Sequence, residues 1–345
     1  MSYHIVTASD VPPEKLHTFL CRFFVQEKCN FLQEHGDWWH CGNHNRWVIL
    51  SEENVVGYCA IIPTKIVVDH NTIPAYWWLD LIIAPEHRRR GLQSSFDKKL
   101  KEMEILKLGF PNETAFIHKK HSWGVRDDLT TKLLPLRPLK VTQVRKSSGF
   151  RKIILKTGAA VLSPIMSLYR KMLKNYKPKY SYRVNQPSVE DFAKIFKNFP
   201  PKNFSTTHRD AEYFTHRFME APYKGNLDYY VSRSDDQLTH YAITRNFVHK
   251  GDRITRILDL YGDFDHIEKI KDLLFCVISD AIKNNSTQIT IMATLTSLKN
   301  LLMHLGFLFN SKARFCWLST DHDLMTELDR KIYWTLADSD NDEIV

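Results

Sequence analysis

A basic loop with three consecutive arginines, Arg88, Arg89 and Arg90, followed by Gly91, carries the residue types that most clearly indicate chemistry. The loop follows the apolar run 75–82 and precedes a helical pattern. Such a loop points backbone N–H groups inward, and the N-terminus of the next helix adds about half a positive charge. The sequence therefore predicts a site for a pyrophosphate-bearing cofactor, which makes the chain a candidate enzyme.

The loop lacks the Gly-Lys-Ser/Thr ending of a P-loop and the three spaced glycines of a dinucleotide-binding turn. It resembles motif A of the GNAT superfamily of acyl-CoA N-acyltransferases, L-x-V-x-P-x-x-R-x-x-G-x-G/A. The matching residues are Leu81, Ile83, Pro85, Arg88 and Gly91. Gln93 departs from the motif, which usually has Gly or Ala there, and its side chain is expected to crowd the backbone beside the phosphates.

The resemblance implies how acyl-CoA, most simply acetyl-CoA, would be held. The diphosphate would lie on the backbone of residues 88–93, Leu92 and Gln93 included, with charge-assisted contacts from the arginines. The alternative for the arginines is a solvated basic turn. The strand before the loop would splay from its neighbour, so that Leu81 and Ile83 present backbone groups to the pantetheine arm, and one N–H would face the thioester oxygen. Asn112 would contact the cofactor through its amide, or is a turn residue after Pro111.

Transfer to an amine also needs a base and an acid. Asp80, in an otherwise apolar strand, is the leading candidate for the general base, and its alternative role is a hydrogen bond to a neighbouring backbone or Trp N–H. Glu86 and Asp37 are weaker candidates for the base. His118 occupies the position of the family's general-acid Tyr and could protonate the leaving thiolate. Otherwise the thiolate leaves unaided and His118 is a surface residue.

The segment Asp37, Trp38, Trp39 and His40 is expected to line the acceptor side of the cleft, because Trp and His stack on sugar or nucleotide rings. A core role for both tryptophans is the alternative. His35, His40, Cys41 and His44 also lie within ten residues of one another. No second ligand cluster accompanies them, and structural zinc sites usually draw ligand pairs from two segments, so no metal is predicted.

The composition indicates a two-domain protein without a membrane span or a signal peptide. The chain has 345 residues, 43% of them hydrophobic, and no run of eighteen apolar residues. Its six cysteines are scattered without a C-x-x-C pair, which favours reduced thiols and a cytoplasmic location. The net charge of +9 is local, because residues 145–180 contain ten Lys or Arg and no Asp or Glu.

The first half predicts a mixed α/β unit. Strands are expected over 3–7, 46–51, 55–63, 65–69 and 76–83, and helices over 12–28, from 92 onward and before Ser122. The order is that of a GNAT unit. A GNAT subgroup linked to bacterial cell-surface polysaccharide or small-molecule pathways is similar over this half. The shared segments are Trp78-Leu79-Asp80-Leu81, Gly109-Phe110-Pro111-Asn112 and Lys120-His121-Ser122-Trp123, the last differing at two positions from the usual K-L-G-W.

The second half repeats this outline as a degenerate GNAT-like unit. Leu258-Asp259-Leu260 echoes Leu79-Asp80-Leu81, strands are expected over 228–233, 238–247 and 288–293, and a helix over 267–282. Residues 261–266 replace the phosphate loop with two carboxylates, which would repel a pyrophosphate. We predict a catalytic domain over 1–140, a basic helical linker over 141–180, a degenerate domain over 181–337 and an acidic tail over 338–345. Coincidence of the Leu-Asp-Leu repeat is the alternative.

Residues 151–174 can form a long helix, which Gly158 and Pro164 weaken or kink. One interpretation is a basic amphipathic helix on an anionic membrane, at the inner face of the cell membrane. The other is a connector whose apolar face packs between the domains. Nucleic acid is an unlikely partner, because few aromatics interleave the basic residues.

Three functions follow from these patterns. The first is an N-acyltransferase, most simply an N-acetyltransferase, acting on a primary amine of a small molecule such as an amino sugar or its nucleotide-linked form. The second is a longer-chain acyltransferase at the membrane surface. The third is a non-catalytic acyl-CoA-binding protein. The sequence leaves the acceptor, the acyl chain length and the oligomeric state open.

Overall fold

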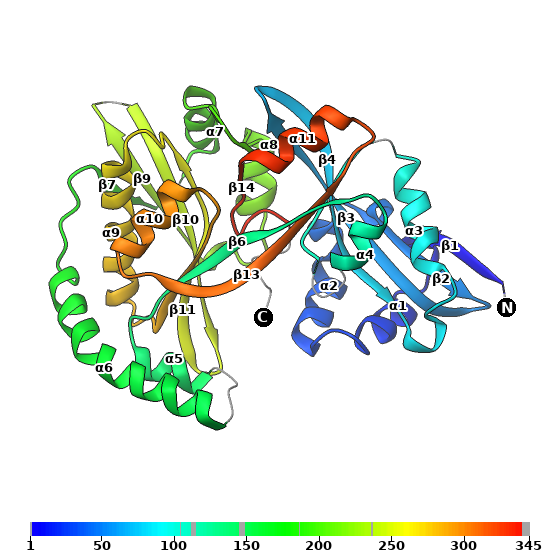
Figure 1. The fold of residues 1–345 in the computed structure, drawn as a ribbon, viewed down its shortest axis with the longest axis horizontal. Helices are drawn as coiled ribbons and strands as arrows, with labels where there is room; N and C mark the ends of the chain where they lie inside the picture. Colours follow the sequence, from blue (N-terminus) through cyan, green and yellow to red (C-terminus); the bar gives the residue numbers. More distant parts are fainter. Residues whose placement is uncertain are drawn as a thin grey trace.

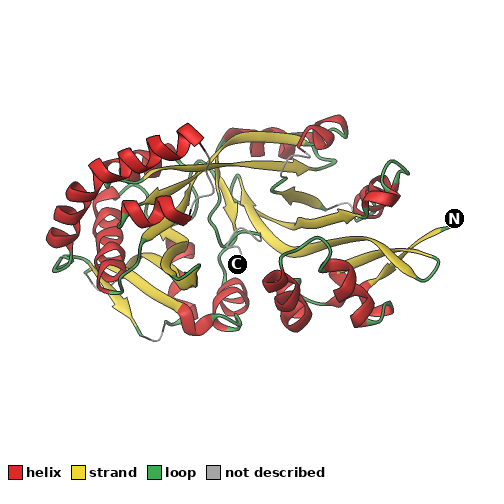
Figure 2. Cartoon of the chain, turned by 90° about the horizontal axis from the view of Figure 1, so that it is seen from below, coloured by secondary structure: helices red, strands yellow, loops and turns green. Residues whose placement is uncertain are grey.

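The computed structural model describes residues 2–103, 105–111, 115–144, 149–185, 187–235 and 237–339. In this part of the chain, strands form one mixed sheet with helices packed on its faces, which confirms the predicted α/β class (Figures 1 and 2). None of the helices in these ranges combines the length and the hydrophobicity that crossing a membrane requires.

The strands are β1 (Tyr3–Thr7), β2 (Arg46–Ser51), β3 (Asn54–Val68), β4 (Asn71–Ile83), β5 (Leu106–Gly109), β6 (Gly124–Leu134), β7 (Ser181–Val184), β8 (Ser205–Thr207), β9 (Leu227–Ser234), β10 (Gln237–His249), β11 (Asp252–Gly262), β12 (Gln288–Ala293), β13 (Leu308–Leu318) and β14 (Ile332–Tyr333). The helices are α1 (Pro13–Leu20), α2 (Gln26–Trp39), α3 (Leu92–Lys101), α4 (Ala115–Lys120), α5 (Pro138–Val144), α6 (Gly149–Leu173), α7 (Val189–Asn198), α8 (Ala211–Phe214), α9 (Ile267–Lys283), α10 (Thr296–His304) and α11 (His322–Arg330).

The strand order of the sheet follows the same pattern when it is counted inward from either edge. It runs β1-β2-β3-β4-β5-β13-β6-β12-β11-β10-β9-β7, so each half supplies five strands in matching order and one strand to the centre. The two central strands are exchanged, because β13 lies beside β5 and β6 lies beside β12. The proposed boundaries at 140 and 181 stay a prediction, and any such domains share a sheet.

The first half packs on both faces of its strands. Along β3, Tyr58 and Ala60 belong to the core under α1 and α2, whereas Cys59 and Ile61 belong to a second core under α3. This alternation is the period of two that a strand buried on both faces requires. Side chains on opposite faces of these strands therefore belong to separate cores.

Several local predictions differ from the structure. The helix expected over 12–28 ends at Leu20, because residues 21–25 turn the chain into α2. The strands expected over 55–63 and 65–69 are one strand, β3, in which Pro63 pairs with Tyr76 of β4. The acidic tail does not begin at 338, because Asp338 and Ser339 are buried and the Asp338 carboxylate accepts hydrogen bonds from Thr335 and Thr207.

Candidate functional site

The loop after β4 has the geometry of an anion site. A 3-10 turn, Pro85–His87, leads into a left-handed residue, Arg89, and then Gly91, whose φ of 77° is also left-handed. A Cβ placed on Gly91 would meet no atom within 4 Å, so the space beside the loop is open. The helix α3 starts at Leu92, and the N–H groups of its first turn have no acceptor inside the helix.

The arginines of the loop are exposed, but two of them are already oriented. Arg88 Nε donates to the carbonyl oxygen of Ile83 at 3.0 Å, and Arg90 Nη1 donates to Tyr3 Oη at 2.9 Å. Glu86 forms an exposed ion pair with Arg22 at 2.9 Å, which lowers the pKa of Glu86. Glu86 is therefore a poor candidate for a base.

Gln93 does not close the loop as its size suggested. Its side chain is half-buried, and its Nε2 is buried without a hydrogen-bond partner among the described residues. An orphaned amide donor beside an open, left-handed glycine suits an oxygen-rich ligand. The loop residues thus fit the diphosphate of acyl-CoA.

Among the described residues, no strand pairs with the edge of β4 next to this loop. Its parallel partner β5 reaches only to Trp78, which pairs with Gly109. On the other side the backbone of Ile82 and Ala84 faces β3, because Ile82 pairs with Tyr58 and the Ala84 N–H donates to Val56. By strand alternation the backbone groups of Leu81 and Ile83 face the open edge, as the predicted pantetheine contact requires.

Asp80 lies at a bulge in β4, with a left-handed φ of 55°. Its side chain is 3% exposed, and Oδ1 accepts a hydrogen bond from Lys28 Nζ of α2 at 2.7 Å. Burial raises the pKa of Asp80, whereas the Lys28 ammonium lowers it, and the pKa lies below its ordinary value. Asp80 is thus an ionised, partly neutralised carboxylate.

His40 and Asp80 face each other as two acceptors. His40 Nδ1 lies 2.9 Å from the Gly36 carbonyl, which fixes the ring proton on Nδ1 in the neutral tautomer. His40 Nε2 then faces Asp80 Oδ2 at 3.9 Å. Both atoms are buried and have no hydrogen-bond partner among the described residues. A single donor placed between them would satisfy both at about 2.8–3.0 Å.

His118 belongs to the other face of the sheet. It packs against Trp78 and Trp123, with ring centroids 5.5 Å and 5.0 Å away, in the core under α3. Asp80 faces α2 on the opposite side. Burial lowers the pKa of His118 to about 4, so the imidazole is neutral at pH 7. The predicted acid is therefore placed as an aromatic core residue, away from Asp80.

The predicted acceptor segment at the end of α2 is divided among several roles. Asp37 is exposed, and its carboxylate is paired with Arg46. Trp38 donates from Nε1 to the His216 carbonyl at 3.0 Å, and Trp39 is a core residue. Of the four residues, only Trp39 lines the cavity described next. Asn112 lies outside the described residues.

A cavity of about 710 Å³ lies between β3 and β4 on one side and α8, the turn after it and residues 337–339 on the other. Its charged lining has more carboxylates than cations: Asp210, Glu212, Glu220 and Asp338 against Lys65 and Arg217. Lys65 pairs with Asp210 and Glu212 at 3.3 Å and 2.8 Å. Arg209 offsets the charge of Asp338, so the lining keeps one carboxylate in excess, three against two, which favours a cationic ligand only weakly. Sequence reasoning missed it, because its residues lie far apart in the chain and share no motif.

A thiol and an imidazole also meet at the cavity wall. Cys41 Sγ lies 3.2 Å from His216 Nε2. Burial raises the pKa of Cys41 to about 11, and burial lowers the pKa of His216. At neutral pH the pair is a thiol beside a neutral imidazole, which is not an activated nucleophile.

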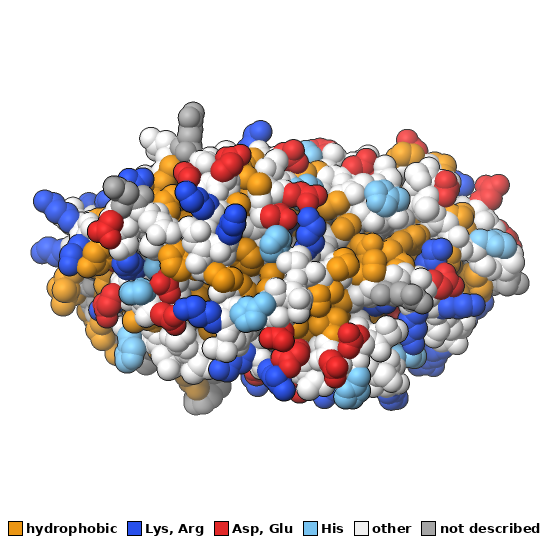
Figure 3. Space-filling model, turned by 90° about the horizontal axis from the view of Figure 1, so that it is seen from above, with side chains coloured by type: hydrophobic (Ala, Val, Ile, Leu, Met, Phe, Trp, Pro, Cys, Tyr) orange, Lys and Arg blue, Asp and Glu red, His pale blue; other side chains and the backbone are white. Residues whose placement is uncertain are grey.

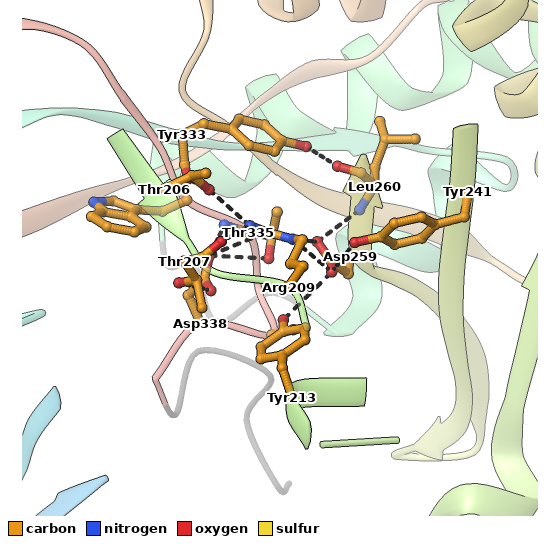
Figure 4. A network of polar contacts seen from close by, with 12 residues as sticks. Thr206, Thr207, Arg209, Tyr213, Tyr241, Asp259, Leu260, Tyr333, Thr335 and Asp338 are labelled. Atoms are coloured by element: carbon orange, nitrogen blue, oxygen red, sulfur yellow. Dashed lines mark hydrogen bonds and ion pairs between the residues drawn. The ribbon is translucent and has the colours of Figure 1, made fainter. Parts of the chain in front are cut away.

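A buried polar network closes one side of the cavity (Figure 4). Arg209 is fully buried and pairs with Asp259 at 3.0 Å and with Asp338 at 3.7 Å. Tyr241 Oη donates to Asp259 at 2.8 Å. Asp259 is the counterpart of Asp80 in the Leu-Asp-Leu repeat. Both of its carboxylate oxygens have hydrogen-bond partners, whereas Oδ2 of Asp80 has none among the described residues.

The cysteines depart from the predicted pattern. Cys21 and Cys29 form a disulfide between the end of α1 and the start of α2, which corrects the expectation of reduced thiols. Among the described residues, His17, Cys21 and Cys29 are the potential metal ligands that lie close together, but the disulfide occupies both sulfurs, so the three do not form a metal site. The cluster of His35, His40, Cys41 and His44 noted in the sequence does not gather in these ranges.

Neither a protein-family model nor a curated protein sequence matches the chain. Solved structures match its fold. A GCN5-related N-acetyltransferase from Anabaena variabilis is 15% identical with a TM-score of 0.60, over 92% of this chain and 72% of its own. Saccharomyces cerevisiae N-myristoyltransferase with bound myristoyl-CoA is 13% identical with a TM-score of 0.58, over 92% and 78%. A probable N-acyltransferase from Enterococcus faecalis is 9% identical with a TM-score of 0.60, over 95% and 74%.

These likenesses confirm the predicted fold. The chain has the fold of the GCN5-related N-acetyltransferases, which N-myristoyltransferase shares over most of the same length.

Proposed function

We propose that the chain is an acyl-CoA-dependent N-acyltransferase that acylates a primary amine of a small molecule. One observation carries the proposal. The open edge of β4 connects the anion-binding loop to the region of Asp80, and the carboxylate-lined cavity begins on the neighbouring residues of the same strand.

Acyl-CoA supplies a thioester, which is an acyl group activated toward amines. The loop from Arg88 to Gln93 binds its diphosphate through backbone N–H groups and the α3 terminus. The backbone of Leu81 and the N–H of Ile83 bind its extended arm along the edge of β4 beyond Trp78, while the Ile83 carbonyl accepts from Arg88. A backbone N–H there stabilises the oxygen on which charge develops.

The amine is oriented by the two buried acceptors. Its ammonium form fits between Asp80 Oδ2 and His40 Nε2, which are 3.9 Å apart and without a donor among the described residues. The ionised Asp80 attracts the cation, and His40 Nε2 is positioned to accept a proton from it. In this arrangement Asp80 acts with His40, and the thiolate leaves without help from His118.

The rest of the acceptor lies in the cavity beyond Trp39. The excess of carboxylates in its lining favours an acceptor with further positive charge or with several hydroxyls, so amino sugars are the proposed class, and the phosphates of a nucleotide-linked form would be repelled. An acetyl group is the proposed donor group. Cys41 is a protonated thiol, so direct transfer to the amine is proposed over a Cys41 acyl-enzyme.

The test is thiol release from acetyl-CoA with a panel of amines, repeated with donors of increasing chain length. Asp80→Asn and His40→Gln should each lower kcat by about 10²-fold or more while leaving coenzyme A affinity within a factor of two. Cys41→Ala should retain activity. Coenzyme A binding without thiol release for any amine would instead favour a non-catalytic binding protein.

A further inference from the structure

The long helix α6 has two separate apolar faces. The first contains Ala159, Met166 and Leu173, which are buried where the helix packs against the body of the protein. In sequence the helix follows α5, and it also contacts α9 of the second half. The connector interpretation, in which the apolar face packs between the domains, accounts for this face alone.

The second face is exposed. It consists of Ile154, Val161, Ile165, Leu168 and Met172, which are each 55–70% exposed. Their spacing of seven, four, three and four residues places them along one side of the helix. Large apolar side chains gathered on one exposed face mark an interaction surface rather than a random distribution.

The segment that carries this face has only positive charges. Residues 149–180 contain eight Lys or Arg and no Asp or Glu. Lys156, Lys171 and Lys174 of this stretch are exposed on or directly after α6. Figure 1 shows α6 along the outer edge of the second half, where a flat partner can approach it without touching the loop after β4.

We propose that α6 binds the surface of an anionic phospholipid bilayer, lying in the plane of the interface with its exposed apolar face in the acyl region. The helix has 25 residues but, like the others in the described ranges, is not apolar enough to cross a membrane, so it lies on the surface. The lysine heads reach the phosphate groups while their methylene chains lie along the apolar region. This inference does not depend on acyl transfer.

The charge pattern of α6 differs from that of the face drawn in Figure 3. Figure 3 shows acidic and basic side chains interspersed over the face that it presents. A helix with apolar residues and only positive charge is therefore a local feature, which complements a negatively charged apolar layer better than it complements water.

Vesicle flotation tests the proposal with the full chain. We expect the wild-type protein to float with vesicles of phosphatidylcholine mixed with phosphatidylglycerol, to float far less with phosphatidylcholine alone, and to be released by salt. Ile165→Glu with Leu168→Glu should weaken binding at least ~10-fold. Val248→Glu is the matched control, because Val248 is equally exposed on β10 and should change nothing.

A second pair of variants separates charge from apolar contact. Lys171→Ser with Lys174→Ser should weaken vesicle binding roughly 25-fold, whereas Lys194→Ser with Lys197→Ser on α7 should not. If thermal melts show that the glutamate variants do not fold, the comparison of the two lysine-to-serine double variants tests the proposal.

Two results would overturn the proposal. One is a wild-type protein that does not float with anionic vesicles. The other is a protein that does not bind vesicles but self-associates, and loses this self-association when Ile165→Glu and Leu168→Glu are introduced. That result would make the face a contact between copies of the chain. The acylation assay contains no vesicles, so its failure and the failure of flotation are distinguishable.

Discussion

Lys28 Nζ lies 2.7 Å from Asp80 Oδ1, and this contact joins the second helix to the bulge of the fourth strand. The lysine is 19% exposed and the carboxylate 3%, so the pair is largely shielded from water. The contact lowers the pKa of Asp80. It therefore connects a residue outside the predicted site to the acidity of a residue inside it.

Replacing Lys28 should change the pH dependence of the reaction. Without the ammonium, burial raises the pKa of Asp80, and the acidic limb of the pH–rate profile, below which Asp80 is protonated, moves to higher pH. We expect the Lys28→Met variant to show this shift of the acidic limb to higher pH when kcat/KM is plotted against pH. Lys197→Met, at an exposed site on α7, is the control. An unchanged limb in Lys28→Met would remove Asp80 from the ionisations that control the rate.

Gly91→Val should weaken coenzyme A binding at least ~10-fold, because the side chain occupies the open space beside the loop and a β-branched residue disfavours a φ of 77°. Gly251→Val is a close control, since Gly251 has a φ of 81° and equally open surroundings in the turn between β10 and β11. Calorimetric titration with coenzyme A measures both. Equal losses in the two variants would show that destabilisation, not the loop, is responsible.

Arg209→Met should destabilise the protein by about 3–5 kcal/mol, because it leaves Asp259 and Asp338 buried together without their cation. Urea unfolding gives this free energy. Lys202→Met removes an exposed ion pair with Asp265, at 68% exposure on each side, and should leave the urea unfolding curve nearly unchanged. Similar values for both variants would contradict the structural role of the network.

His118→Phe should keep kcat within about twofold, because the ring fills an aromatic cluster and carries no proton at pH 7. The pKa of His118 is lowered to about 4, so the unfolded chain binds a proton here between pH 6.5 and 4 and the folded chain does not. This residue therefore costs stability as the pH falls through that window. The Phe variant should lose less stability on acidification than wild type, as unfolding curves across these pH values would show. A large loss of kcat would restore the acid role.

The loop and the strand before it could be predicted because their signals are local. Pro85, Arg88 and Gly91 define a turn within a few residues, and the left-handed φ of Gly91 is the conformation for which glycine is selected. The choice of Leu81 and Ile83 rests on the resemblance to the GNAT motif, and their role in binding a cofactor stays a prediction.

The rest depended on contacts between distant parts of the chain. No local pattern in residues 124–134 indicates that this strand pairs with residues 288–293. Similarly, the spacing that matched His118 to a family position does not indicate on which face of the sheet His118 lies. Asp338 was assigned to a solvated tail because acidic residues follow it, whereas Arg209 neutralises it in the interior. Charge partners that are 129 residues apart leave no periodic signal.

The exchange of β6 and β13 has a consequence for biosynthesis. The edge of β5 is covered by residues 316–318, which a ribosome adds some 200 residues after β5 itself. During that interval the nascent chain exposes an unpaired strand edge, the kind of surface on which chaperones act and misassembly begins. A fragment ending near residue 140 would lack residues 316–318, so we expect it to expose the edge of β5 and to aggregate more readily than the full chain.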